Sequence, residues 1–328
     1  AYALGVRLVG SEMCIRDRVV SWAAKRLAKR HEQPLFLSVG IYRPHVPWYA
    51  PQKYFDRFPL DKIQLPKHLK GDLGDVPAAG QKMAKRHWHE WITENGQWKK
   101  AVQGYLASLA FADEMVGELL DALDNGPMAN DTLIVFWGDH GYHLGEHDFW
   151  AKVSLLEEST RVPLIIHVPG KKPAVCSSFA ELLDLYPTLS SLCGLDVPAR
   201  LQGKDLAPVF DDPSHSVRDA AFSVNGKGFL LREDRWAYIE YGKNGSKGAE
   251  LFDMEKDPAQ FTKLAKRPAH RTAGLLPAMV YQLSKALHAF DYDLEDWGGL
   301  DRASFNAQVS ERDRKRKATA TQAAGIRL

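Results

Sequence analysis

The chain has 328 residues, 45% of them hydrophobic, and a formal net charge of +2 at pH 7. This length and hydrophobic content are typical of a folded protein of about two domains. The near-neutral charge gives no reason to expect nucleic acid as a partner. No apolar stretch approaches the ~18 residues that a membrane-spanning helix needs, so the sequence predicts no transmembrane segment.

The first predicted elements are a helix, a strand and a long connection. An amphipathic helix is expected at 19–32, and a continuous apolar strand at 34–41. The strand runs into His45, which stands between two prolines that would hold it in an extended loop. Such a histidine, taken alone, is more often structural. The following region, 42–97, is expected to be irregular, and long irregular loops usually serve a site.

A long helix and two further strands follow. Residues 98–123 carry one apolar stripe at helical spacing and are expected to form a helix. Continuous apolar runs predict buried strands at 131–137 and 163–168, and a helix is expected at 179–193. Strands that alternate with helices predict an α/β fold with a mostly parallel sheet between layers of helices.

The pattern changes after about residue 210. Short strand candidates at turn-separated spacing predict a small antiparallel subdomain with a helix behind it at 273–290. The strand candidates are 220–224, 228–232, 236–241 and 250–253, and Asn225-Gly226 is a hairpin turn signal between the first two. We expect a catalytic α/β domain at 19–210, a C-terminal subdomain at 211–296 and a basic helical or disordered tail at 297–328.

The end of the strand at 131–137 is the most informative place in the chain. The apolar run stops at Gly138, and Asp139 and His140 follow. In open α/β sheets the ligand crevice lies beyond the carboxyl ends of the strands, and a carboxylate beside an imidazole can bind one divalent cation. An isolated Asp-His-Gly is equally compatible with a polar loop that caps backbone groups. The nearby polar side chains favour a site; they are His143, Glu146, His147, Lys152 and the more distant His167.

Five stretches of the sequence carry a resemblance to a known family. In chain order they are FLSVGIYRPHVPW, GDHGYHLGEHDFWAK, RVPLIIHVPG, ELLDLYPT and ELFDMEKDP. Together they resemble the type I sulfatases of the alkaline phosphatase superfamily. The sequence around Glu146, Trp150 and Lys152 is most similar to that of iduronate sulfatase-like members. The ordered resemblance covers most of residues 34–264, and it implies a sulfuric ester hydrolase that acts on a sulfated carbohydrate or a small sulfate ester.

The resemblance also implies roles for particular residues. Asp139 and His140 would be metal ligands, Lys152 would bind the sulfate and the leaving oxygen, and His45 would contact sulfate or assist the leaving group. Weaker expectations for the substrate wall concern Glu146, His147 and Trp150, and Glu146 is also compatible with a turn cap alone. Calcium (Ca2+) is the expected metal, while Mn2+ and Zn2+ stay open because histidine is a softer ligand than calcium prefers.

The nucleophile that the resemblance implies is absent from this sequence. Sulfatases carry Cys-x-Pro-x-Arg, in which cysteine or serine becomes formylglycine, and a formylglycine-generating enzyme would be the partner of the full-length protein. Cys14 has an arginine at the right separation but Arg16 where proline belongs, so we interpret it as a chance match. Residues 1–18 resemble translated sequencing-adapter read-through and are interpreted as a non-native scar. This chain is therefore expected to be an inactive fragment. The resemblance, and not the sequence itself, suggests that the enzyme is exported (periplasmic, secreted or lysosome-like).

Two other functions stay open at this point. One is a metal-dependent phosphatase or phosphodiesterase of the same superfamily, in which Asp139, His140 and His143 would hold transition metals. Lys152 disfavours this alternative, because such enzymes typically place a second metal where sulfatases use cationic side chains. The other is a non-catalytic binding protein, which a full-length gene without the Cys-x-Pro-x-Arg motif would favour.

Overall fold

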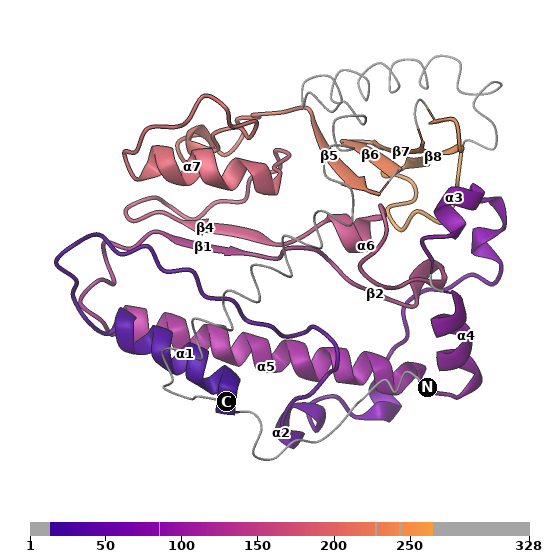
Figure 1. Cartoon of the computed structure of the whole chain (residues 1–328), viewed down its shortest axis with the longest axis horizontal. Helices are drawn as coiled ribbons and strands as arrows, with labels where there is room; N and C mark the ends of the chain where they lie inside the picture. Colours follow the sequence, from indigo (N-terminus) through magenta and orange to yellow (C-terminus); the bar gives the residue numbers. More distant parts are fainter. Residues whose placement is uncertain (1–13, 85, 227, 243–244, 265–328) are drawn as a thin grey trace, which may run out of the picture. The chain divides into compact units, whose positions relative to one another are not determined.

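The computed structural model describes residues 14–264 except residues 85, 227 and 243–244. All of these belong to the first of two compact units of the chain, Ala1–Thr272. The predicted helix at 273–290 and the basic tail lie outside the described residues. Figure 1 shows the arrangement of the labelled helices and strands. No described helix is long and apolar enough to cross a membrane.

Helix α5 (Trp98–Asp124) is the longest helix of the described chain, and it confirms the prediction for residues 98–123. Helix α1 (Cys14–Leu27) and the short helix α2 (Gln52–Phe55) pack against it. Their shared core includes Val20 from α1, Tyr54 from α2 and Phe111 from α5, and the Tyr54 and Phe111 ring centroids are 5.2 Å apart. Figure 1 shows α1 alongside α5.

The connection before α5 is less irregular than expected. It contains short helical segments, and all of them except the first bury residues. These are η2 (Leu60–Lys62), η3 (Asp72–Asp75), α3 (Ala78–Gln81) and α4 (Arg86–Glu94). The predicted strand at 34–41 is absent from the structure. This stretch pairs with no strand among the described residues, and Phe36 is 85% exposed.

The first strand pair corrects the expected parallel pairing. Strand β1 (Ile134–Trp137) pairs with β4 (Leu164–His167), and the pair is antiparallel, with Phe136 opposite Ile165. A parallel pair needs a crossover of a dozen or more residues that is usually a helix. The connection between β1 and β4 holds only a two-stranded hairpin, a 3-10 turn (η4, Glu146–Asp148) and the one-turn helix α6 (Glu157–Thr160), and the chain returns in the opposite direction.

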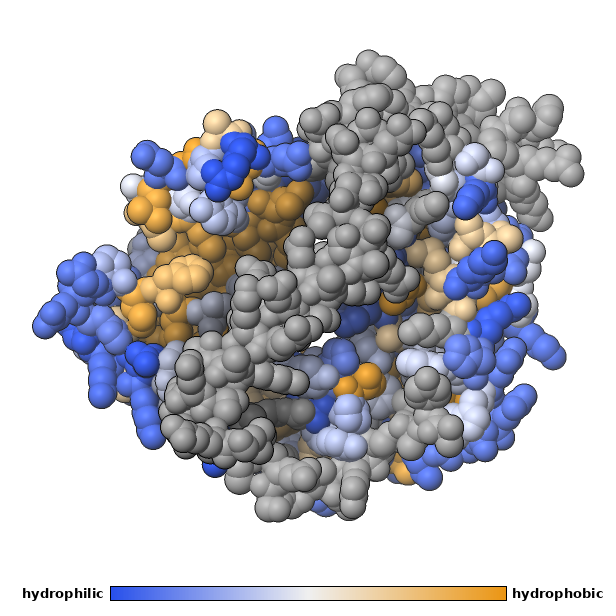
Figure 2. All heavy atoms as spheres, viewed as in Figure 1, coloured by the Kyte–Doolittle hydropathy of each residue, from blue (hydrophilic) through white to orange (hydrophobic). Residues whose placement is uncertain are grey.

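This strand pair also leaves apolar side chains uncovered by other described residues. Phe136, Trp137 and Ile165 are 41%, 44% and 62% exposed, although their continuous apolar sequence predicted burial on both faces. Figure 2 shows hydrophobic surface gathered in the region of β1, β4 and helix α7 (Leu185–Leu192). Helix α7 and the preceding turn η5 (Leu182–Asp184) replace the longer helix expected at 179–193. The turn η6 (Ala207–Phe210) ends this part of the chain.

The antiparallel C-terminal sheet is confirmed. Its strands pair in chain order and lie close to the predicted ranges; they are β5 (Ala220–Asn225), β6 (Gly228–Glu233), β7 (Trp236–Tyr241) and β8 (Ala249–Asp253). Asn225 pairs with Gly228 across the β5–β6 turn, as the Asn-Gly signal predicts. The buried side of the sheet shares a core with residues of η3 and of the hairpin between β1 and β4, including Leu73, Phe149 and Ile239.

Candidate active site

Asp139 and His140 follow β1 at its carboxyl end, as the sequence predicts. His140 Nε2 lies 3.5 Å from Asp139 Oδ2. His140 Nδ1 is 2.8 Å from the carbonyl oxygen of Gly141, which can only accept a hydrogen bond. The proton of a neutral ring is therefore on Nδ1, and the lone pair of Nε2 is on the side of Asp139.

This arrangement fits a divalent cation. Ligand atoms about 2.0–2.4 Å from one ion lie about 3–3.5 Å apart, which is the separation of Asp139 Oδ2 and His140 Nε2. Gly141 lets the chain after His140 pass close to the backbone of Glu158, because a Cβ there would lie 1.9 Å from the carbonyl oxygen of Glu158. The Asp139 side chain is 82% exposed, so these two residues alone form an open, incomplete site.

Lys152 is placed by a small hairpin. Strands β2 (His143–Leu144) and β3 (Trp150–Ala151) pair, and Lys152 follows β3 directly. Its side chain is half-buried, and its ammonium group has no ion-pair partner within the described part of the chain. The turn after it is held by Ser154, whose Oγ lies 2.8 Å from Nε2 of the fully buried His143. The half-buried ammonium group is therefore available to an anionic ligand.

The hairpin also contains the three residues that were weaker candidates for the substrate wall, Glu146, His147 and Trp150. The Glu146 carboxylate accepts a hydrogen bond from the Leu144 N–H at 2.6 Å. This contact is the turn cap that the sequence allowed as an alternative to a place in the substrate wall. His147 is 2% exposed, and its Nδ1 and Nε2 lie 2.7 Å and 3.1 Å from Asp72 Oδ2 and the Ala259 carbonyl oxygen. Trp150 is 3% exposed. The contacts of all three side chains are therefore within the protein fold.

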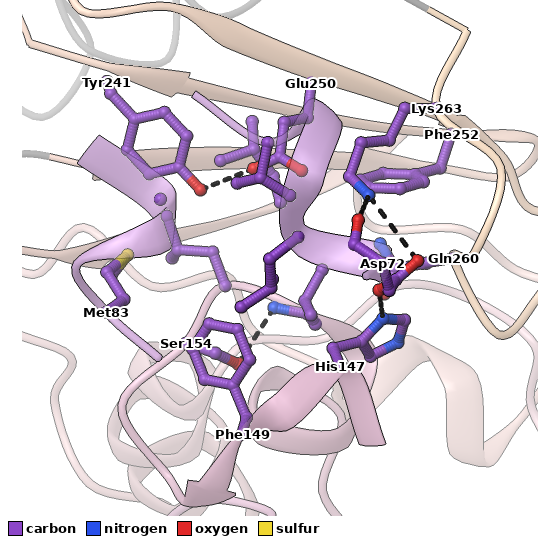
Figure 3. A pocket seen from close by; sticks show the side chains of 16 residues that line it. Asp72, Met83, His147, Phe149, Ser154, Tyr241, Glu250, Phe252, Gln260 and Lys263 are labelled. Carbon is purple, nitrogen blue, oxygen red and sulfur yellow. Dashed lines mark hydrogen bonds and ion pairs between the residues drawn. The ribbon is translucent and has the colours of Figure 1, made fainter. Parts of the chain in front are cut away.

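Figure 3 shows the inner side of this hairpin. His147, Asp72 and Lys263 meet at one side of a small cavity, and Tyr241 donates to Glu250 at the other, 2.7 Å apart. The cavity volume is about 20 Å³, which suits one water molecule rather than a substrate. Burial raises the pKa of Glu250. The cavity is lined mostly by apolar side chains and lies between the hairpin and the C-terminal sheet.

His45 lies in a turn rather than in the extended loop that its two prolines predicted. Its backbone N–H donates to the Tyr42 carbonyl oxygen at 3.1 Å, and the buried Arg43 guanidinium donates to the carbonyl oxygen of His45 at 2.6 Å. His45 Nδ1 lies 2.6 Å from the Val46 carbonyl oxygen. The proton of a neutral ring is again on Nδ1, which leaves Nε2 as the reactive nitrogen.

Sequence reasoning missed a group of three side chains that includes Asp148 of the hairpin turn η4. His68, His89 and Asp148 come from three separate segments, and their ligand atoms lie within 4.8 Å of one another. The only sequence signal was the density of histidines in 42–97, in the stretches around His68 and His89. Nothing in their spacing indicated that they meet Asp148.

Comparison with known proteins gives the family. The sulfatase family model matches residues 10–195, and the model for the C-terminal part of N-sulphoglucosamine sulphohydrolase matches residues 145–288. The chain belongs to the sulfatase family. It is 39% identical to a sulfatase of Formosa agariphila over 252 residues, which is 74% of this chain and 48% of that protein. It is 31% identical to human iduronate 2-sulfatase, covering 86% of this chain and 55% of that protein.

Solved structures support the same fold. A structure of BT4656 in complex with its substrate D-glucosamine-2-N,6-O-disulfate matches with a TM-score of 0.68 at 20% identity, covering 85% of this chain and 70% of that chain. The phosphonate monoester hydrolase of Silicibacter pomeroyi matches with a TM-score of 0.71 at 23% identity, covering 85% and 60%. The α/β fold of the sulfatase and alkaline phosphatase type is confirmed. The chain spans about half the length of the curated sulfatases compared above.

Proposed function

We propose that this chain is part of a sulfuric ester hydrolase that acts on a sulfated carbohydrate. The observation that carries the proposal is the pair of Asp139 Oδ2 and His140 Nε2, 3.5 Å apart at the end of β1, in a chain of the sulfatase family. Human iduronate 2-sulfatase, one of the relatives, supports a carbohydrate substrate.

Asp139 and His140 would hold the metal ion. A bound divalent cation would neutralise negative charge on the sulfate oxygens. Asp139 contributes a hard oxygen ligand that suits Ca2+, and His140 contributes a nitrogen ligand that Mn2+ and Zn2+ also accept. Further ligands would come from the rest of a longer protein.

Lys152 and His45 would act on the sulfate ester itself. The half-buried Lys152 ammonium group offers a charge-assisted hydrogen bond to a sulfuryl oxygen and to the leaving oxygen. An alkoxide is a poor leaving group, so a protonated His45 Nε2 near the leaving oxygen would favour departure of the alcohol. Tyr42 Oη lies 2.8 Å from His45 Nδ1 and helps to fix the ring orientation.

The nucleophile belongs to the longer protein in this proposal. A formylglycine produced by a formylglycine-generating enzyme would stand in that part, and the whole protein would be exported. This 328-residue chain, which has no Cys-x-Pro-x-Arg motif, would not hydrolyse sulfate esters.

The test is activity of the full-length gene product, co-expressed with a formylglycine-generating enzyme. Sulfated disaccharides, choline sulfate and phosphate monoesters would be compared as substrates, with this 328-residue chain as the control. Hydrolysis of a sulfated disaccharide by the full-length protein alone supports the proposal. A preference for phosphate monoesters would replace it with the phosphatase alternative, and a full-length gene without the nucleophile motif would indicate a non-catalytic binding protein. Activity of this chain that is lost in Cys14→Ala would show that Cys14 is not a chance match.

A further inference from the structure

His68, His89 and Asp148 form a cluster in which both imidazoles face one carboxylate. His68 Nε2 lies 2.7 Å and His89 Nε2 lies 3.6 Å from the same atom, Asp148 Oδ1. The two rings are stacked with centroids 4.7 Å apart. The three side chains are 23%, 8% and 13% exposed, so the cluster is largely withdrawn from water but reachable from it.

Three separate segments hold this geometry. His89 is on α4, His68 is on the extended segment before η3, and Asp148 is in the turn η4. Asp148 has a φ of +59°, a left-handed conformation that a residue with a side chain rarely adopts. Backbone strain of this kind persists only where the surroundings fix it, and here the Asp148 carboxylate lies toward the Nε2 atoms of both histidines.

The donor set selects one class of ligand. Two imidazole nitrogens and one carboxylate oxygen suit Zn2+ and similar transition-metal ions, whereas calcium prefers six to eight oxygen ligands. Burial lowers the pKa of His89, and the neighbouring His68 lowers it further while Asp148 raises it.

We propose that His68, His89 and Asp148 form a binding site for one Zn2+ ion, separate from the Asp139–His140 pair. Three protein ligands leave the fourth tetrahedral position to water. The ion takes the place of the protons that lie between the imidazoles and Asp148, and it links the region before α5 to the β2–β3 hairpin. The two metal sites then differ in chemistry: an open site beyond β1, and a half-buried zinc site at the hairpin turn.

Two neighbours oppose zinc and set its affinity. The Trp150 indole N–H donates to His89 Nδ1 at 3.2 Å, which places the ring proton of metal-free His89 on Nε2. Zinc binding at Nε2 moves that proton to Nδ1 and removes this hydrogen bond. Arg86 Nε lies 3.7 Å from Asp148 Oδ2 and adds a positive charge beside the site. Removal of the indole donor should therefore tighten zinc binding.

The first experiment measures zinc bound by the 328-residue chain after equilibrium dialysis. The variant Asp139→Ala/His140→Ala removes the open site and should still bind about one Zn2+ per chain. In that background, His68→Ala and Asp148→Asn should each weaken binding by more than about tenfold, because loss of even an outer partner of a metal ligand costs 10–100-fold. His87→Ala is the matched control, since His87 is an exposed histidine on the same helix as His89.

The second experiment uses Trp150→Phe in the same background. Release of the indole hydrogen bond, at about 0.5–1.5 kcal/mol, should tighten zinc binding about 2-fold to 10-fold. Zinc should also raise the unfolding temperature of the chain, and His68→Ala should abolish that rise. Zinc binding that is absent from the folded chain, or unchanged in both His68→Ala and Asp148→Asn, would overturn the site. Weaker binding by Trp150→Phe would overturn the assignment of His89 Nε2 as a ligand.

Discussion

His147 Nδ1 lies 2.7 Å from Asp72 Oδ2, although the two residues are 75 positions apart in the chain. Lys263 reaches the same residue from the C-terminal side, where its Nζ donates to the Asp72 carbonyl oxygen at 3.3 Å. Lys263 Nζ also lies 3.0 Å from Asp75 Oδ1. A histidine expected at the substrate wall thus belongs to a buried ionic network that joins the hairpin, η3 and the segment after β8 (Figure 3).

The first prediction concerns this network. Lys263→Met should destabilise the chain by about 3–5 kcal/mol, because it leaves the buried Asp72 carboxylate without its lysine partner. The Lys263 and Asp72 side chains are each only 3% exposed, so solvent screens their interaction little. Urea unfolding measures the change. Lys256→Met at an exposed site nearby is the control, and a loss below about 1 kcal/mol in Lys263→Met would contradict the role of the network.

The second prediction is a pH dependence of stability caused by His143. Burial and, to a smaller extent, nearby His147 together lower the pKa of His143 to about 3. Glu146 Oε2 is 4.0 Å from its Nδ1. The unfolded chain takes up this proton near pH 6.5 and the folded chain only near pH 3, so the unfolded state binds more protons between these values. Above pH 6.5, His143 should therefore have no effect on the free energy of unfolding. As the pH falls from 6.5 toward 3, it should lower the free energy of unfolding by up to about 1.4 kcal/mol per pH unit.

The measurement is urea unfolding at several pH values between 7 and 4. The slope of the unfolding free energy against pH should become smaller in His143→Gln. His87→Gln, at an exposed position, should leave this slope unchanged. Burial also lowers the pKa of His89, so part of the slope should persist in His143→Gln. An equal slope in His143→Gln and in the parent chain would show that His143 does not cause the dependence.

Local sequence patterns predicted the elements whose stability is local. An apolar stripe at helical spacing predicts helix α5, which has 27 residues, and its predicted and observed bounds agree within one residue. The β5–β8 sheet is set by short strands joined by turns, of which the Asn225-Gly226 turn is the clearest signal. In both cases the residues that decide the structure are close in sequence, so their pattern is sufficient.

The errors concern contacts between distant residues. The apolar stretch at 34–41 has the composition of a strand, but a strand also needs a partner, and no partner is recorded for it within the described ranges. The direction of pairing between β1 and β4 depended on the connection between them, which contains a hairpin instead of a long helix. The meeting of His68, His89 and Asp148 depends on the path of the chain through 42–97, which no periodicity indicates.

The third prediction concerns calcium. Asp139 and His140 supply two protein ligands, whereas calcium takes 6–8 oxygen ligands, so this chain should bind calcium weakly. Calorimetry should show no micromolar affinity. Micromolar or tighter calcium binding that is lost in Asp139→Ala would show that this chain holds the complete site.

The fourth prediction concerns His45 in the full-length enzyme. If His45 Nε2 assists the leaving group, His45→Ala should lower turnover by about 10²–10⁴. The loss should be smaller for an aryl sulfate, whose phenol leaves more readily than an alcohol. His215→Ala at an exposed position is the control. An equal loss for alkyl and aryl sulfates would contradict a role on the leaving group.

The last prediction separates sulfate recognition by Lys152 from a structural role. In the full-length enzyme, Lys152→Ala should remove a charge-assisted hydrogen bond that is made chiefly in the transition state. The loss should cost about 3–4 kcal/mol, or 10²–10³ in kcat/KM, with little change in melting temperature. The ammonium group of Lys152 has no ion-pair partner among the residues that the structure describes, so its removal breaks no ion pair of the described fold.

Kinetics and thermal unfolding of the same preparations decide between the two roles. Lys172→Ala provides the matched control, because Lys172 is an exposed lysine away from the hairpin. Lys152→Arg keeps the positive charge but changes its shape, so it should recover only part of the lost kcat/KM if the contact is directional. Near-normal kcat/KM together with a lowered melting temperature in Lys152→Ala is the result of a structural lysine, and it would remove Lys152 from the proposed site.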